Sequence, residues 1–103
     1  MSENKVKVVG ADWCPDTRGA LAVFALLDIK VEYHADYNGQ QFVKRNIRIP
    51  EITFDDRVIN EPTSAELLKA LLVIGVINEQ KISEDIRAHC KKADEARVKR
   101  RSK

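Results

Sequence analysis

Apolar and polar residues alternate in four short stretches of this 103-residue chain, as they do in β-strands that bury one face. The stretches cover residues 5–9, 30–35, 49–54 and 57–59. A pair of aspartates, Asp55-Asp56, separates the last two and predicts a tight turn. The pattern therefore predicts four strands, the last two forming a hairpin.

The intervening stretches have the features of helices. Pro15 directly follows Cys14, which suits the first position of a helix, and the apolar run over residues 20–27 predicts that this helix is largely covered. After the break at Asn38-Gly39, residues 40–45 predict a short helix. A further helix follows a capping box of Thr63 and Glu66.

The leucines that follow this capping box predict a buried stripe on the third helix, and Gly75 predicts its end. The apolar residues from 71 to 77 are more than one helix face needs, so either the last helix or a second copy of the chain covers them. Ser83 can cap a last helix, whose apolar stripe of Ile86, Cys90 and Ala93 is thin. Beyond Ala96 the density of charge predicts fraying.

Read in order, these elements predict an α/β fold with a four-stranded mixed sheet flanked by helices on both faces. A strand–helix–strand unit requires a right-handed crossover and a parallel pair, whereas the later hairpin is antiparallel. We assign residues 1–79 to one domain and residues 80–103 to a basic C-terminal helix and tail. This arrangement is that of a short thioredoxin fold with a C-terminal helical extension.

Composition limits the function classes. Apolar residues make up 44% of the chain and charged residues 33%, which excludes collagenous, low-complexity and wholly disordered proteins. No apolar run reaches the roughly 18 residues of a membrane span, and the first residues lack a secretory signal. Two cysteines 76 positions apart indicate neither a disulfide framework nor a zinc site. We therefore expect a reduced, cytoplasmic protein without a metal site.

The net charge is +2, but the charged residues are distributed unevenly along the chain. From Arg87 onward, eight Lys and Arg residues accompany two acidic residues, whereas residues 1–86 hold ten basic and fourteen acidic residues. The basic segment has no interleaved aromatic residues, so we regard nucleic acid as an improbable partner.

The strongest chemical signal lies between the first strand and the first helix, in the run Trp13-Cys14-Pro15-Asp16-Thr17-Arg18. A cysteine at a helix N-cap faces unpaired amides and the positive end of the helix dipole, and both favour a thiolate. Thr17 can turn its hydroxyl toward the sulfur, Arg18 adds positive charge, and Trp13 can shield the thiol. Asp12 and Asp16 oppose the thiolate.

Three motifs in this order resemble the glutaredoxin family, and most closely its short mycoredoxin-like type. They are the Trp13–Cys14 run, Ile49-Pro50-Glu51-Ile52-Thr53-Phe54-Asp55-Asp56, and Asn60-Glu61-Pro62-Thr63-Ser64-Ala65-Glu66-Leu67. The resemblance covers residues 5 to about 75. The chain departs from the family at Thr17, which replaces the second cysteine of a dithiol motif, and around Pro62, where many glutaredoxins have two glycines.

The resemblance implies roles for several residues. Cys14 corresponds to the nucleophile, supported by Thr17 and Arg18. The thiol and substrate would be bound by Trp13, Pro15, Ile49 and Pro50, with Pro50 as a cis-proline whose preceding residue presents its backbone to an extended substrate. The amides of Thr63, Ser64 and Ala65 would receive a glutathione carboxylate.

The expected activity is thus that of a monothiol, glutaredoxin-like thiol–disulfide oxidoreductase acting on mixed disulfides. Its co-substrate would be glutathione or another low-molecular-weight thiol, no cofactor would be bound tightly, and its partner would be a disulfide-bearing protein. Cys90 is better explained by burial than as a resolving cysteine.

Two alternatives stay open at this point. One is a non-catalytic module that binds a thiol or peptide and uses the basic tail for a partner. The other is a dimer that carries an iron–sulfur cluster between two Cys14 thiolates. The sequence allows either a monomer or a homodimer.

Overall fold

The computed structural model describes residues 6–35, 48–54 and 57–101. The short helix expected at residues 40–45 and the turn at Asp55-Asp56 lie outside this part of the chain.

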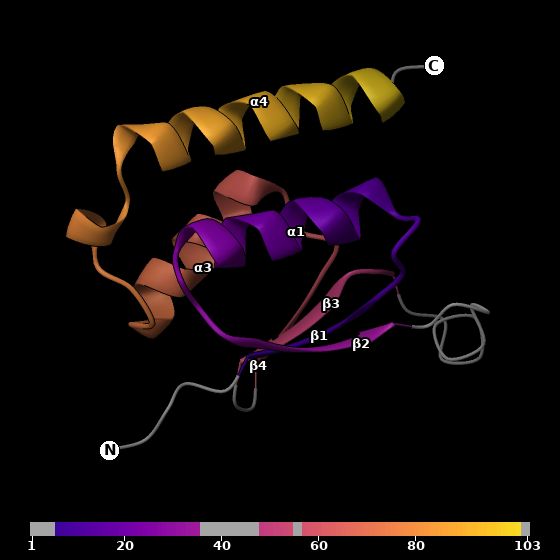
Figure 1. The fold of residues 1–103 in the computed structure, drawn as a ribbon, viewed down its shortest axis with the longest axis horizontal. Coiled ribbons are helices and arrows are strands. Elements are labelled where there is room, and N and C mark those ends of the chain that lie inside the picture. Colours follow the sequence, from indigo (N-terminus) through magenta and orange to yellow (C-terminus); the bar gives the residue numbers. More distant parts are fainter. Residues whose placement is uncertain (1–5, 36–47, 55–56, 102–103) are drawn as a thin grey trace.

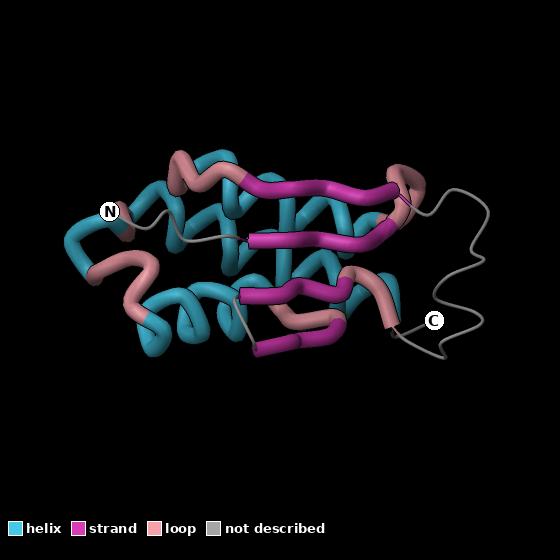
Figure 2. Tube along the Cα trace, turned by 90° about the horizontal axis from the view of Figure 1, so that it is seen from below, coloured by secondary structure: helices cyan, strands magenta, loops and turns pink. Residues whose placement is uncertain are grey.

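The sheet has the four predicted strands, β1 (Val6–Gly10), β2 (Val31–Ala35), β3 (Glu51–Phe54) and β4 (Arg57–Asn60). Their order across the sheet is β2-β1-β3-β4. The β1–β2 pair is parallel, and β3 pairs antiparallel with both β1 and β4 (Figure 2). The mixed sheet and the hairpin were thus predicted correctly.

Helix α1 (Pro15–Leu26) makes the crossover from β1 to β2, and α3 (Ser64–Ile74) follows the hairpin. A 3₁₀ turn, η1 (Glu79–Lys81), leads into α4 (Glu84–Arg101). The three described α-helices lie on the same face of the sheet, with α1 and α3 against the strands and α4 outside them (Figures 1 and 2). Helix α4 therefore forms a third layer. The predicted helices on both faces of the sheet are not borne out by the described helices, which all lie on one face.

One continuous apolar core joins these layers. Val8 and Ile52 of the sheet lie in it together with Phe24 of α1 and Leu71 of α3. The C-terminal segment belongs to the same core because Ile82, Ile86 and Cys90 are buried in it. Within the apolar run before it, Ile77 is buried whereas Val73 is exposed.

The prediction that the chain frays beyond Ala96 is wrong. Helix α4 continues to Arg101, and the side chain of Arg97 is buried. Arg97, Arg100 and Arg101 at this end have partners on α1 and on the segment before α3, described below, and these contacts hold the last turns of the helix.

No helix in the described part of the chain combines the length and the apolar character that crossing a membrane requires.

Gly10, the last residue of β1, makes the close approach of α1 possible. A Cβ atom at this position would lie 2.5 Å from both Cγ2 and Oγ1 of Thr17, which is fully buried. Gly19, inside α1, has no neighbouring atom within 4 Å of its ideal Cβ position. The two glycines therefore provide a matched pair for a test.

We expect Gly10→Ala to destabilise the protein by about 1–3 kcal/mol, because the new methyl group overlaps Thr17. Gly19→Ala should stabilise it by about 0.5–1 kcal/mol, because alanine is the better residue within a helix. Urea denaturation of both variants measures the free energies of unfolding. A Gly10→Ala variant as stable as the parent would show that α1 does not pack on β1 as described.

Candidate functional site

Cys14 lies at the N-cap of α1, where the backbone is still extended. Its amide donates to the carbonyl of Ala11 (3.0 Å), and its carbonyl accepts the amide of Arg18 (3.1 Å), which begins the helix. The free thiol is 8% exposed and packs with Ala11 and Ile49 in a small cluster separate from the main core. Its side chain does not bond to an amide of the first helical turn. The predicted N-cap position is confirmed.

Thr17 has other partners than the expected Cys14 sulfur. Its hydroxyl oxygen accepts a hydrogen bond from the Ala11 amide at 3.4 Å and lies against Gly10. The described residues include no hydrogen bond between Thr17 and the sulfur of Cys14. Thr17 thus holds the loop between β1 and α1, which shapes the surroundings of Cys14 indirectly. Arg18 is exposed on the first turn of α1.

The other expected thiol-binding residues flank Cys14. Trp13 is 61% exposed, Pro15 is exposed, and Ile49 is buried against Cys14. The Ile49–Pro50 peptide is cis, and the carbonyl of the buried Pro50 accepts the amide of Glu61 (2.8 Å). The segments around residues 14 and 50 are therefore side by side, as the resemblance implied.

The N-terminus of α3 has the predicted capping box. The Thr63 hydroxyl accepts the amide of Glu66 at 3.0 Å, and the Glu66 carboxylate accepts the amide of Thr63 at 2.8 Å. The pKa of Glu66 lies below its ordinary value, mainly because its carboxylate accepts the backbone amide of Thr63 and, second, because it interacts with the Thr63 hydroxyl.

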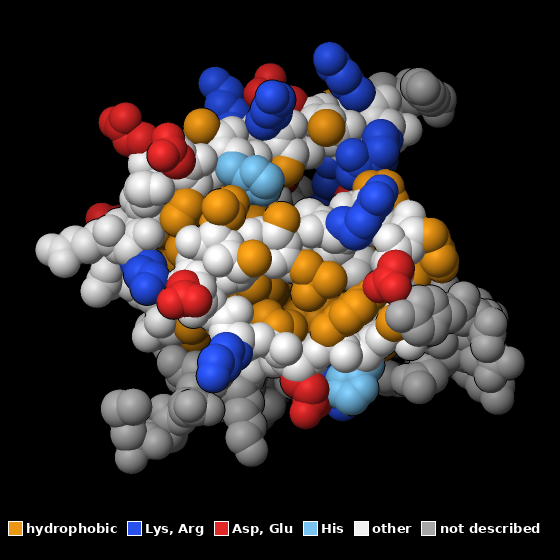
Figure 3. All heavy atoms as spheres, viewed as in Figure 1, with side chains coloured by type: hydrophobic (Ala, Val, Ile, Leu, Met, Phe, Trp, Pro, Cys, Tyr) orange, Lys and Arg blue, Asp and Glu red, His pale blue; other side chains and the backbone are white. Residues whose placement is uncertain are grey.

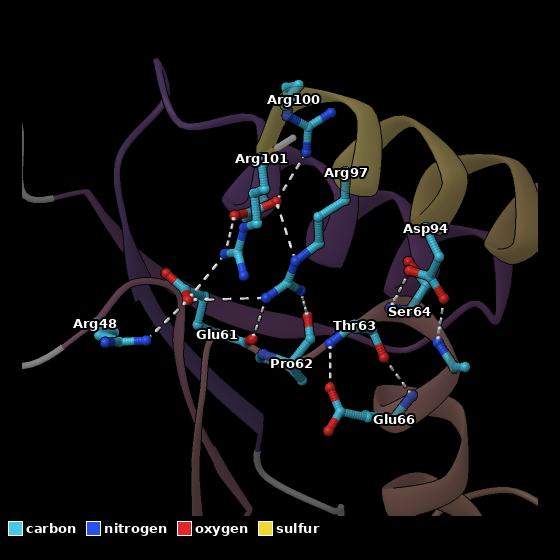
Figure 4. Close-up of polar contacts among 12 residues, drawn as sticks. Arg48, Glu61, Pro62, Thr63, Ser64, Glu66, Asp94, Arg97, Arg100 and Arg101 are labelled. Carbon is cyan, nitrogen blue, oxygen red and sulfur yellow. Dashed lines mark hydrogen bonds and ion pairs between the residues drawn. The ribbon is translucent and has the colours of Figure 1, made fainter. Parts of the chain in front are cut away.

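The next two backbone amides, those of Ser64 and Ala65, already have a hydrogen-bond acceptor. The Asp94 carboxylate on α4 accepts the amide of Ser64 at 2.7 Å and that of Ala65 at 3.0 Å (Figure 4). The expectation that these amides are available to a glutathione carboxylate is therefore wrong for this conformation. A helix N-terminus attracts carboxylates, and here the chain supplies its own from Glu66 and Asp94.

One helical turn along α4, Arg97 holds the segment that precedes α3. Its guanidinium donates to the carbonyls of Pro62 (2.6 Å) and Glu61 (2.8 Å), and its side chain is about 10% exposed. Because charged hydrogen bonds in partly buried positions are strong, Arg97 fixes α4 on the residues next to α3.

Two carboxylates complete this contact with the end of α4. Asp16 of α1 pairs with Arg100 at 2.9 Å and with Arg101 at 3.2 Å, and it lies 4.0 Å from Arg97. Glu61 pairs with Arg101 at 2.9 Å, which raises the pKa of that guanidinium, and with Arg48 at 3.6 Å. Figure 3 shows Lys and Arg side chains gathered over this end of α4.

Asp16 was predicted only to oppose the thiolate, and the predicted site residues did not include Glu61, Asp94, Arg97, Arg100 or Arg101. A signal was present on α4, because Asp94, Arg97 and Arg101 continue the helical spacing of Ile86 and Cys90. The partners of these residues lie about 30 or more positions earlier, which spacing on one helix does not reveal.

A cavity of about 90 Å³ lies under α4 between the first turns of α1 and α3. Its lining includes Pro15 and Asp16 on one side, Thr63 and Ser64 on the other, and Asp94 from α4. A second hollow, of about 500 Å³, runs between α3 and α4 and is lined by residues such as Leu68, Leu72 and Val98. Only the smaller one adjoins the residue next to Cys14.

Cys90 differs from Cys14 because it lies in the main apolar core. It is 3% exposed within the main core, and burial is the first cause that raises its pKa above the ordinary 9.0, followed by the charge of Asp94. Its predicted burial is confirmed. No group of three or more His, Cys, Asp and Glu suitable for a metal ion occurs among the residues described.

No family model, curated protein or solved structure matches this chain. Any assignment of function therefore depends on the motifs and on the geometry around Cys14.

The raised pKa of Cys90 predicts a loss of stability in alkali. In the unfolded chain this thiol ionises near 9.0, whereas the folded protein keeps it protonated to higher pH. Its contribution is therefore complete below pH 9 and is lost as pH rises toward the folded pKa, by at most about 1.4 kcal/mol per pH unit. Urea denaturation between pH 8 and 10 should show a shallower decline for Cys90→Ala than for Cys14→Ala. Equal slopes would contradict this prediction.

Proposed function

We propose that this protein is a monothiol, glutaredoxin-like thiol–disulfide oxidoreductase that acts on mixed disulfides through Cys14. The observation that carries the proposal is the placement of a free cysteine, 8% exposed as a residue, at the N-cap of α1. The amides at this end of a helix stabilise negative charge on a nearby sulfur. Cys90 lacks such a position and is buried in the core.

The reaction needs one protein sulfur. The Cys14 thiolate attacks one sulfur of a mixed disulfide, a new bond joins Cys14 to that sulfur, and the other sulfur leaves as a thiolate that takes up a proton. Cys14 is thereby oxidised to a mixed disulfide, and the released thiol is reduced. A second small thiol, as its thiolate, attacks the sulfur bound to Cys14, forms a small disulfide and returns the Cys14 thiolate.

The surroundings of Cys14 suit a small thiol bound beside it. The exposed Trp13, which directly precedes Cys14 in the chain, offers a flat apolar surface, and Ile49 packs against Cys14. Arg18, exposed on the first turn of α1, adds positive charge near the helix N-terminus. We propose glutathione or another low-molecular-weight thiol as the co-substrate and a disulfide-bearing protein as the substrate.

The first test is covalent trapping at near-neutral pH. The reduced protein is mixed with glutathione disulfide or with bis(2-hydroxyethyl) disulfide, and the products are measured by intact mass and peptide mapping. We expect a single adduct on Cys14, removed by excess thiol, for at least one of the disulfides. Cys14→Ser should give none, and Cys90→Ser should behave as the parent. The absence of any adduct would overturn the proposal in favour of a non-catalytic binding module.

The second test compares substrate classes. Without a resolving cysteine beside Cys14, the intermediate formed with a protein dithiol reverts instead of being resolved. We therefore expect the Cys90→Ser variant to reduce a glutathionylated peptide at least about tenfold faster than insulin, measured by thiol release with an excess of small thiol. Equal rates would contradict a monothiol mechanism.

A further inference from the structure

The hollow of about 500 Å³ between α3 and α4 has the size of a binding site for a small molecule. Its lining includes Leu68 and Leu72 from α3, and Ile82 and Cys90 from the C-terminal segment. Three of these four residues are buried in the main core and only Leu72 is partly exposed, so packing fixes an apolar floor. Cys14 is not in the lining, so the hollow is separate from the proposed thiol chemistry.

Three cations border this apolar floor: Lys69 on α3, and Arg87 and Lys91 on α4. All three are exposed, and none of them has an ion pair with another described residue. The acidic residues of the lining are Asp94 and Glu95. Because the Asp94 carboxylate lies against two amides of α3, its charge is already partly compensated. The rim is therefore positive on balance.

The positive charge is concentrated toward one end of the hollow. Helix α3 begins beside Asp94, since this carboxylate accepts the Ala65 amide, and residues 75–83 join the end of α3 to the start of α4 (Figure 1). The two helices therefore run in opposite directions along the hollow. Lys69 lies one turn beyond Ala65, toward this connection. Lys91 lies one turn before Asp94, toward the same connection.

The surface beside the hollow does not suit a protein partner. Protein interfaces have centres poor in Lys and Glu, whereas the outer face of α4 carries closely spaced charges such as Lys92, Glu95 and Lys99. The apolar surface is confined to the hollow between the helices. A small molecule can use this surface without covering the charges around it.

We propose that the hollow binds a small amphipathic anion of the fatty-acid class, with one unbranched apolar chain and a carboxylate head. The chain lies on the floor that Leu68 and Leu72 contribute to, where removal of apolar surface from water supplies most of the affinity. The head lies at Lys69 and Lys91, whose flexible ammonium groups attract a carboxylate without requiring a fixed geometry. The same cations repel an amphiphile with a positive head.

The experiment titrates the full-length protein with dodecanoate, dodecyltrimethylammonium and butanoate below their micellar concentrations, and isothermal titration calorimetry measures the affinities. We expect a single dodecanoate to bind per chain, at least about tenfold more tightly than butanoate because butanoate lacks most of the apolar chain. Dodecanoate should also bind at least about tenfold more tightly than dodecyltrimethylammonium, because the rim is positive. No binding of dodecanoate, or equal affinity for both heads, would overturn the proposal.

Charge reversal tests the rim. Lys69→Glu combined with Lys91→Glu should invert the preference, so that the ammonium amphiphile binds at least about threefold more tightly than dodecanoate. The control combines Lys92→Glu with Lys99→Glu, which changes the net charge equally at exposed positions outside the lining, and should keep the preference for dodecanoate. If the reversed variant does not fold, as judged by circular dichroism, glutamine at the same two positions should weaken dodecanoate binding at least about threefold.

A pair of neighbouring residues on α3 tests the floor. Leu72→Ser removes an apolar side chain from the lining and should weaken dodecanoate binding about tenfold. Val73→Ser changes the next residue, which is exposed and outside the lining, and should leave the affinity unchanged. Equal effects of the two variants, or of the two charge variants, would place the ligand elsewhere and overturn the proposal. So would sedimentation that shows a dimer of the free protein which Leu72→Ser dissociates, because a second copy would then cover the hollow.

Discussion

The contact between α4 and the beginning of α3 is the constraint that holds the third layer of the fold on the other two. A helix N-terminus leaves its first amides without partners, and the turn before it leaves carbonyls without donors. Asp94 satisfies two of these amides, and Arg97 satisfies the carbonyls of Glu61 and Pro62. The two side chains lie one turn apart on α4. One face of this helix therefore supplies a carboxylate to the amides of α3 and a guanidinium to the carbonyls of the segment before α3.

This contact also changes how the negative charge of Asp16 affects Cys14. In the sequence, Asp16 is an acidic residue two positions from Cys14 that disfavours a thiolate. In the structure its carboxylate pairs with Arg100 and Arg101, with Arg97 at 4.0 Å. The basic end of the chain thus neutralises a charge next to the candidate nucleophile. Acidic and basic residues that are far apart in the sequence lie side by side in the structure.

Local patterns were enough to predict the strands, the capping box of Thr63 and Glu66, and the end of α3 at Gly75. Each depends on residues within a few positions of one another. The extent of α4 was predicted wrongly because a dense run of charges is usually solvated, and only partners distant in sequence show otherwise. The carboxylate on α3 was missed for the same reason, since Asp94 lies 30 positions after Ser64.

Thr17 shows why a motif position does not by itself define a chemical role. The resemblance places it where dithiol glutaredoxins have a second cysteine, and its hydroxyl was predicted to donate to the sulfur. In the structure the side chain is fully buried, accepts the Ala11 amide and fills the space left by the missing side chain of Gly10. A residue in this position is constrained by the packing of α1 on β1. The proposed chemistry therefore rests on Cys14, and Thr17 contributes to it only through the loop that it holds.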